Sequence, residues 1–203
     1  MKKRDLNSNP WADKTVAQTV EMYREWAAHY DEDLIGSGYL SPARCATAMR
    51  SVLAPEDPIL DFGCGTGLSG TALSNAGFTT FDGCDVTAEM LEIAKQKSIY
   101  RRLWLAQPET IDLGSAAYRG VIAAGVISRG AAPADTLAAL LHAMPTDCYL
   151  AFSYNDPTIA DPAYQKALKI VQDQNLAMLI SSEYGPHIPS KDMGSDVILL
   201  QRI

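Results

Sequence analysis

The segment ILDFGCGTGLSG, residues 59–70, places glycines at two possible spacings directly after an apolar run. Starting from Gly65 the spacing is GxGxxG, which is typical of loops that bind the pyrophosphate of a dinucleotide. Starting from Gly63 it is GxGxG and follows the carboxylate of Asp61, which repels a phosphate and suits a ligand that carries an ammonium group. The segment therefore predicts a nucleotide-like ligand and leaves two classes of cofactor open.

The spacing that starts at Gly63 accounts for more of the loop. With a start at Gly65, Gly63 and Cys64 would be additional turn residues without a role, because the strand before them ends near Phe62. Asp85 can accept both ribose hydroxyls in either class of ligand, so this acid does not discriminate. S-adenosylmethionine has an ammonium group and no phosphate. We therefore expect S-adenosylmethionine as the cofactor, with S-adenosylhomocysteine as its product and NAD as the alternative.

From residue 58 onward, short apolar runs alternate with helical stretches, which predicts an α/β fold with a mostly parallel sheet. Strands are expected at residues 58–63, 79–85, 101–106, 119–125 and 148–154, and helices at about 67–76, 87–97, 134–144 and 162–175. Two further strand-like runs, 176–184 and 196–203, have no helix between them. We expect these two runs to pair in antiparallel fashion at one edge of the sheet.

Two helices are expected before this alternating pattern begins. An apolar residue recurs every three or four positions over residues 16–30, and the pattern is broken at Gly36. A second apolar stripe covers residues 46–53, and Ser41 is expected to cap the helix that carries it. These helices must lie against the sheet or over the ligand that it binds.

The composition is that of an ordinary globular protein, and it limits the class of partner. The chain has 203 residues and a net charge of -7, which disfavours nucleic acid and anionic membranes as partners. Its four cysteines and three histidines form no metal-binding or redox spacing. No targeting segment or membrane-spanning apolar run is recognised, so a cytoplasmic protein without a metal is expected. The oligomeric state is left open.

Several stretches resemble known methyltransferases. ILDFGCGTG resembles motif I of the class I S-adenosylmethionine-dependent methyltransferases, and residues 82–95 look like the segment that follows it. Residues 20 to 185 are similar to the methyltransferase-like 27 group of the Williams-Beuren region. The resemblance implies a Rossmann-like class I fold: a mostly parallel seven-stranded sheet with an antiparallel last strand, helices on both faces and an N-terminal helical lid. The expected lid is residues 1–54, and the cofactor-binding core is residues 55–203 of a single domain.

The resemblance also implies a set of cofactor contacts. Gln107 stands where the family usually has an acid that contacts the adenine amino group, and its side-chain oxygen can accept the same hydrogen bond. The expected cofactor-binding residues are Tyr30, Asp61, Gly63, Cys64, Gly65, Gly67, Asp85, Val86, Met90, Gln107, Ala124 and Ile127.

No single residue is predicted as the catalytic group. Tyr154 and Asn155 follow the fifth strand, where they can face a substrate or form the turn into the next helix. His187, in the terminal loop, is either a proton acceptor or a solvated residue, and Tyr39 can cover the site from the lid. The segment after the fourth strand lacks the Asn-Pro-Pro-aromatic motif that binds a planar amino group, so methylation of nucleic-acid bases loses its main support in the sequence.

The function that these features predict is methyl transfer from S-adenosylmethionine to an O, N or S nucleophile of a small molecule. The sulfonium already activates the methyl group, so alignment of the reactants can suffice without a strong base. Two alternatives remain open. The first is a non-catalytic protein that binds S-adenosylmethionine or S-adenosylhomocysteine, and the second is an NAD-dependent oxidoreductase.

Overall fold

The computed structural model describes residues 14–114 and 117–203, and within them seven strands form one sheet. The strands are β1 (Ile59–Phe62), β2 (Phe81–Asp85), β3 (Leu103–Leu105), β4 (Gly120–Ala123), β5 (Tyr149–Asn155), β6 (Ala177–Ile188) and β7 (Met193–Arg202). Their spatial order is β3-β2-β1-β4-β5-β7-β6. Strands β1 to β5 pair in parallel, whereas β7 runs antiparallel to both β5 and β6. The mostly parallel sheet, its antiparallel last strand and the pairing of β6 with β7 are therefore as the sequence predicted.

The chain reverses its direction of progress across the sheet at β1. Strand β2 lies on one side of β1 and β4 on the other, with Asp61 opposite Gly83 and Ile122 respectively. The loops that leave the carboxyl ends of β1 and β4 therefore diverge, and a crevice opens between them. In folds of this kind, ligands bind at that crevice.

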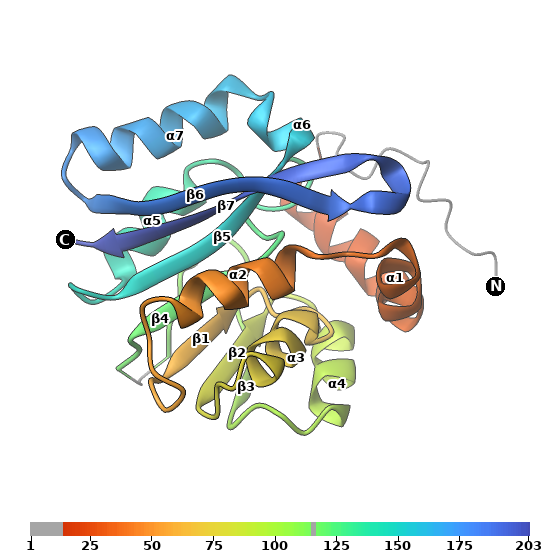
Figure 1. Cartoon of the computed structure of the whole chain (residues 1–203). Helices are drawn as coiled ribbons and strands as arrows, with labels where there is room; N and C mark the ends of the chain where they lie inside the picture. Colours follow the sequence, from red (N-terminus) through yellow and green to blue (C-terminus); the bar gives the residue numbers. More distant parts are fainter. Residues whose placement is uncertain (1–13, 115–116) are drawn as a thin grey trace.

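Helices cover both faces of the sheet, as expected. They are α1 (Val16–Ser37), α2 (Ser41–Arg50), α3 (Leu68–Asn75), α4 (Ala88–Gln96), α5 (Thr136–Ala143), α6 (Asp156–Ile159) and α7 (Pro162–Asp173), with a 3-10 turn η1 (Pro189–Lys191). Ile59 packs with α2 and α3 on one face, and Leu60 packs with α5 and α7 on the other (Figure 1). This alternation follows from the two-residue period of a strand. Among the described residues, no helix is both long and apolar enough to cross a membrane.

The N-terminal helices differ from the expected lid in one respect. Helix α2 belongs to the core, because Cys45, Ala46 and Met49 are fully buried against the sheet. Ser41 does not cap this helix either. Leu40 occupies the N-cap position, and the Ser41 hydroxyl bonds to His187 instead. Of the described residues in 1–54, the part that can act as a lid is therefore α1, and residues 1–13 lie outside the described residues.

Helix α1 has clear local start and stop signals. At its start, Thr15 and Gln18 form a capping box, in which each side chain accepts the backbone N–H of the other residue at 3.2 and 2.9 Å. At its end, Gly38 adopts the left-handed conformation, with φ of 77°. Between these caps, α1 packs beside α4 near the carboxyl ends of the parallel strands (Figure 1).

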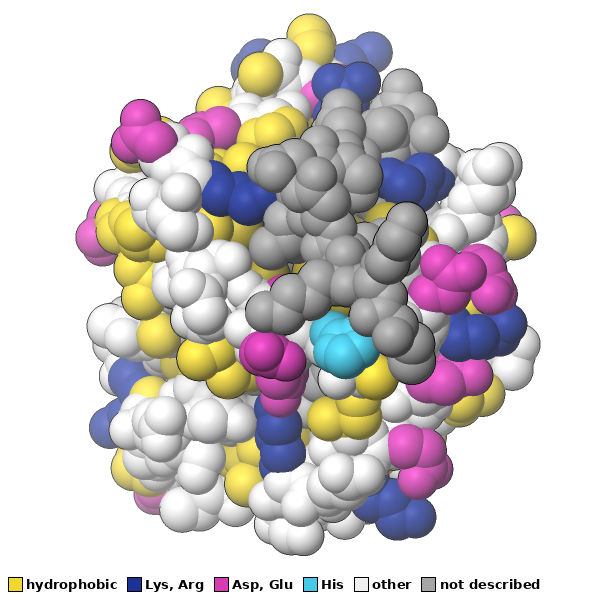
Figure 2. Space-filling model, turned by 90° about the vertical axis from the view of Figure 1, so that its right-hand side faces the viewer, with side chains coloured by type: hydrophobic (Ala, Val, Ile, Leu, Met, Phe, Trp, Pro, Cys, Tyr) yellow, Lys and Arg dark blue, Asp and Glu magenta, His cyan; other side chains and the backbone are white. Residues whose placement is uncertain are grey.

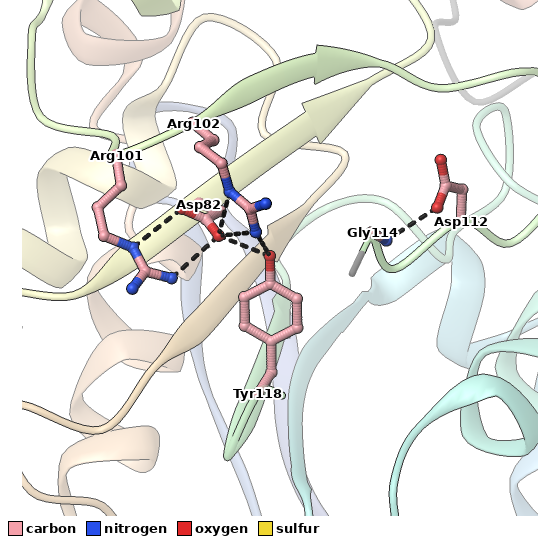
Figure 3. A network of polar contacts seen from close by, with 6 residues as sticks. All are labelled: Asp82, Arg101, Arg102, Asp112, Gly114 and Tyr118. Carbon is pink, nitrogen blue, oxygen red and sulfur yellow. Dashed lines mark hydrogen bonds and ion pairs between the residues drawn. The ribbon is translucent and has the colours of Figure 1, made fainter. Parts of the chain in front are cut away.

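A buried carboxylate joins the segments at the opposite, amino-terminal end of the sheet. Asp82 on β2 accepts hydrogen bonds from Arg101, Arg102 and the Tyr118 hydroxyl at distances of 2.7–3.2 Å (Figure 3). Burial raises the pKa of Asp82, but the hydrogen bonds from the arginines and the tyrosine outweigh it, so the pKa lies below its ordinary value. This network therefore stabilises the fold and does not belong to the ligand crevice.

Candidate cofactor and acceptor site

Two adjoining cavities lie at the carboxyl ends of the parallel strands. The larger has a volume of about 630 Å³ and is lined by the ends of β1, β2 and β4, the loop after β3, and α1. The smaller, of about 70 Å³, lies between α1, the segment after β4 and the end of β6. Tyr23, Tyr30, Gly125 and Ala131 line both cavities. We call them the cofactor cavity and the acceptor cavity, and their shared wall is where two reactants could meet.

Gly65 has the features of a glycine that a ligand approaches. Its φ is 53°, and a Cβ atom added there would meet no heavy atom within 4 Å. Its backbone also lines the cofactor cavity. Gly63 lines the same cavity, but a Cβ there would come within 2.6 Å of Val126, so this glycine is required for close packing of two loops.

The remaining glycines of the segment make room for a protein side chain. A Cβ on Gly70 would lie 2.2 Å from the Tyr100 hydroxyl oxygen, and one on Gly67 would lie 3.2 Å from the Tyr100 ring. That hydroxyl donates a 2.6 Å hydrogen bond to Asp61, which is fully buried. Gly70, the third glycine of the GxGxxG spacing, is therefore required to make room for Tyr100 and not for a ligand. Tyr100 carries no motif of its own, and the sequence did not indicate this role.

Asp61 does not line the cofactor cavity, contrary to the expectation that its carboxylate faces the ligand. Its side chain lies on the same face of the sheet as Ile59, and the Tyr100 hydroxyl holds one of its oxygens. Burial raises the pKa of Asp61 to about 7, although hydrogen bonds from Tyr100 and Ser69 lower it. Asp61 thus supports the loop through Oδ2, whereas its buried Oδ1 atom has no hydrogen-bond partner among the described residues.

Asp85 is the acid that reaches the cofactor cavity. Its two carboxylate oxygens accept the backbone N–H groups of Gly65 and Thr87, each at 2.8 Å. Each oxygen keeps a second lone pair for a ligand hydroxyl. Burial raises the pKa of Asp85, and these backbone hydrogen bonds lower it in part. Asp85 thus connects the glycine loop to the start of α4 while it lines the cavity.

Most of the other predicted cofactor residues also line the cofactor cavity. They are Tyr30, Val86, Met90, Gln107 and Ala124. Cys64, Gly67 and Ile127 are not part of its lining. Cys64 and Ile127 are buried at 4% and 0% exposure, and Gly67 begins α3 against the Tyr100 ring. The sequence pattern alone could not separate a residue beside the ligand from one behind it.

A carboxylate from α1 also reaches the glycine loop. Asp31 accepts a hydrogen bond from the Thr66 hydroxyl and forms an ion pair with Lys97 at 2.7 Å. Thr66 lies within the glycine-rich segment, and Lys97 follows α4. This contact joins three segments that are distant in sequence, and no local pattern predicted it.

The structure brings three of the four acceptor-side candidates together. Tyr39, Asn155 and His187 all line the acceptor cavity, and the rings of Tyr39 and His187 meet edge to face at 5.1 Å between centroids. Tyr154 lies elsewhere. Its side chain is fully buried in the core beside Phe152, so it does not face a substrate.

His187 is neither in a loop nor solvated. It lies near the end of β6 at 5% exposure, and its Nδ1 atom is 2.7 Å from the Ser41 hydroxyl oxygen. The pKa of His187 is lowered to about 4, mainly by burial and in smaller part by the positive charge of Arg44, while the charge of Asp156 acts in the opposite direction. The imidazole is therefore neutral near pH 7. Among the described residues, no group of three or more potential metal ligands is found.

Comparison with known families identifies the central part of the chain. Residues 59–145, which include the glycine loop and Asp85, match the family described as "Methyltransferase domain". The chain is therefore similar to methyltransferases in this central region. It is 31% identical to human methyltransferase-like protein 27 over 128 residues, which are 60% of this chain and 52% of that protein. The chain thus spans about half the length of the curated relative it matches.

Solved structures with the same fold extend over nearly the whole chain. An S-adenosylmethionine-dependent methyltransferase from Leishmania major superposes with a TM-score of 0.68 at 15% identity, covering 97% of this chain and 85% of that one. The plantazolicin methyltransferase BpumL, in complex with S-adenosylhomocysteine, gives 0.62 at 12% identity and covers 91% and 94%. The fold of the described residues is therefore the Rossmann-like class I fold.

Proposed function

We propose that the protein transfers a methyl group from S-adenosylmethionine to an O, N or S nucleophile of a small molecule. The observation that carries this proposal is the pair of adjoining cavities, one lined by Gly65 and Asp85 and the other by Tyr39 and His187. A donor and an acceptor bound in them would meet at the shared wall formed by Gly125 and the residues around it. Holding two reactants in this way is the main task of a methyltransferase.

The residues of the cofactor cavity suit S-adenosylmethionine. We infer that Asp85 accepts the ribose hydroxyls, that Gly65 permits close approach, and that Gln107 accepts the adenine amino group. Met90 and Ala124 supply apolar contact for the adenine ring. When bound, the cofactor supplies an electrophilic methyl group on a sulfonium. The protein contributes binding, orientation and exclusion of water, the last of these through Tyr23 and Tyr30 of α1.

The alternative of a dinucleotide has less support in the loop geometry. A pyrophosphate at the start of α3 would approach the carboxylate of Asp31, which already bonds to Thr66 at that point. Coulomb repulsion there would oppose binding, and the Lys97 charge is already taken up by the ion pair with Asp31. The glycine loop therefore favours a ligand without phosphate.

The dimensions and charge of the site favour a small acceptor. The acceptor cavity of about 70 Å³ has room for a group of only a few heavy atoms. On the face that carries α1, acidic and basic side chains of the described residues are intermixed and form no continuous basic band (Figure 2). A nucleic-acid strand would need such a band for its phosphates.

Calorimetry followed by a turnover assay tests the proposal. We expect S-adenosylhomocysteine to bind saturably and NAD not to compete with it. Labelled S-adenosylmethionine, incubated with the protein and a panel of small metabolites, should then yield S-adenosylhomocysteine with at least one acceptor. Binding of NAD without binding of S-adenosylhomocysteine would reject the methyltransferase assignment. Tight binding of S-adenosylhomocysteine without turnover across a broad panel would favour the non-catalytic alternative.

A further inference from the structure

The hydrogen bonds behind the acceptor cavity determine whether its polar side chains present donors or acceptors to a guest. Three polar groups line it from separate elements: Tyr39 before α2, Asn155 at the end of β5, and His187 near the end of β6. From their partners we propose that this cavity binds a carboxylate, and that the methyl acceptor is a small carboxylic acid. The identity of the acceptor rests on the proposed function, whereas carboxylate binding can be measured without it.

His187 is held as a hydrogen-bond donor. Arg44 can only donate, and it donates to the Ser195 hydroxyl oxygen at 3.0 Å. Ser195 is fully buried. Among the described residues, the acceptor that its hydroxyl hydrogen can reach is the Ser41 hydroxyl oxygen, at 3.1 Å. Ser41 must then donate its own hydrogen to Nδ1 of His187 at 2.7 Å. The neutral imidazole therefore carries its hydrogen on Nε2.

The opposite direction of this chain is unfavourable. If Nδ1 of His187 carried the hydrogen, Ser41 would donate to Ser195, and the Ser195 hydrogen would be buried without an acceptor. An unsatisfied buried hydroxyl costs free energy that the first arrangement avoids. Because Nδ1 is occupied by Ser41, Nε2–H is the group of His187 that can bond to a guest in the acceptor cavity.

Asn155 presents a donor for a related reason. Its Oδ1 atom accepts the Thr158 backbone N–H at 3.1 Å and the Thr158 hydroxyl at 2.6 Å. A backbone N–H can only donate, so the atom that it reaches must be the oxygen of the amide. The amide NH2 of Asn155 is therefore the part left for a ligand in the acceptor cavity.

The rest of the lining completes a site for an anion. The Tyr39 hydroxyl lies against Gly125, where an added Cβ would be 2.5 Å from its oxygen, so a third donor stands at the wall shared with the cofactor cavity. Arg129 and Lys191 also line the cavity, although Arg129 already forms an ion pair with Asp161 at 3.9 Å, and no Asp or Glu of the described residues lines it. Ser128 also lines the cavity, but its hydroxyl hydrogen is not available to a guest because it is donated to the Gly125 carbonyl at 3.3 Å.

A carboxylate matches this arrangement in charge and in size. It is acceptor-only when ionised, and its two oxygens can receive the three donors. A carboxylate also has no proton to lose on methylation, so it needs no base. This suits the cavity, because Nε2 of His187 already carries a hydrogen and cannot accept a proton from the guest. A neutral amine has one lone pair and an alcohol has two, so neither can accept from all three donors, and an ammonium group can accept from none.

The test measures binding of acetate and propionate, and of the matched primary amides, by NMR line shifts and calorimetry. It is carried out with and without saturating S-adenosylhomocysteine. We expect each carboxylate to bind at least about tenfold more tightly than its amide, because charge-assisted hydrogen bonds are the stronger ones. Equal or tighter binding of the amides, or of the matching amines, would overturn the proposal.

Two variants locate the site. Asn155→Asp keeps the oxygen that caps α6 but replaces the NH2 donor by an anionic oxygen, so carboxylate binding should weaken about 10- to 100-fold. Asn75→Asp, at the exposed end of α3, adds the same charge away from the cavity and should change nothing. Retained S-adenosylhomocysteine affinity in Asn155→Asp would show that the fold is intact. Carboxylate binding that survives Asn155→Asp would overturn the assignment of this cavity.

The two proposals can fail separately. If S-adenosylhomocysteine binds and carboxylates do not, the carboxylate site is wrong and the proposed methyl transfer stands. If carboxylates bind in the manner described and S-adenosylhomocysteine does not, the site stands and the proposed function falls.

Discussion

Asp85 has a structural role through its backbone contacts, and its proposed ligand-binding role can be tested separately. Asp85→Ala removes two hydrogen bonds to a bound ribose and both backbone contacts, so S-adenosylhomocysteine affinity should fall by about 2–4 kcal/mol. Asp85→Asn retains one side-chain oxygen and should lose less. Calorimetry measures both variants against the parent. Unchanged affinity in Asp85→Ala would mean that the carboxylate only connects the glycine loop to α4.

The glycines of the cofactor segment differ in what they accommodate, and alanine substitution distinguishes them. Gly70→Ala drives a methyl group into the Tyr100 hydroxyl and should lower the free energy of unfolding by about 1–3 kcal/mol. Gly36→Ala meets no atom within 4 Å inside α1 and should raise it by about 0.5–1 kcal/mol. Urea unfolding compares the two variants. A stable Gly70→Ala protein would show that the Tyr100 ring moves aside at little cost.

At the scale of elements, Asp31 connects α1 to the glycine loop, and we expect this contact to couple the proposed lid to cofactor binding. Asp31 holds Thr66 and Lys97, which belong to the segments before α3 and after α4. Asp31→Ala removes both contacts, so amide hydrogens of residues 15–40 should exchange about three- to tenfold faster without ligand. Hydrogen exchange followed by mass spectrometry measures this change.

The same experiment tests whether α1 is ordered by the cofactor. S-adenosylhomocysteine should increase protection of residues 15–40 in the parent protein, because α1 lines both cavities. Glu21→Ala, on an exposed part of α1, is the control and should exchange like the parent. Equal protection with and without ligand would identify α1 as a permanently docked helix.

At the scale of the whole molecule, the Asp82 network makes stability depend on pH. The pKa of Asp82 is lowered in the folded protein, so its contribution is fully present above the ordinary pKa of about 4 and is lost as pH falls through the folded value. Asp82→Asn should therefore cost about 1–3 kcal/mol at pH 7 and less at pH 4. Urea unfolding at both values measures the difference. Asp173→Asn, in an exposed ion pair, should have little effect at either pH.

The local sequence by itself determined the alternation of strands and helices, the terminal antiparallel pair and the position of the cofactor loop. Each of these depends on short-range patterns: apolar periodicity and glycines that follow a strand. The sequence also placed the glycine loop and Asp85 at one ligand, because parallel neighbouring strands bring their carboxyl ends to one edge.

Tertiary structure decided which of these residues face a ligand. The contacts of Tyr100 with Asp61, of Asp31 with Thr66, and of His187 with Ser41 join residues that are 39, 35 and 146 positions apart. A pattern in sequence cannot report such pairs, because the burial, donor direction and pKa of a side chain depend on atoms brought to it from other elements by folding. For the same reason, the sequence could name His187 as a candidate while its buried, neutral, hydrogen-donating state followed only from Ser41, Ser195 and the packing around them.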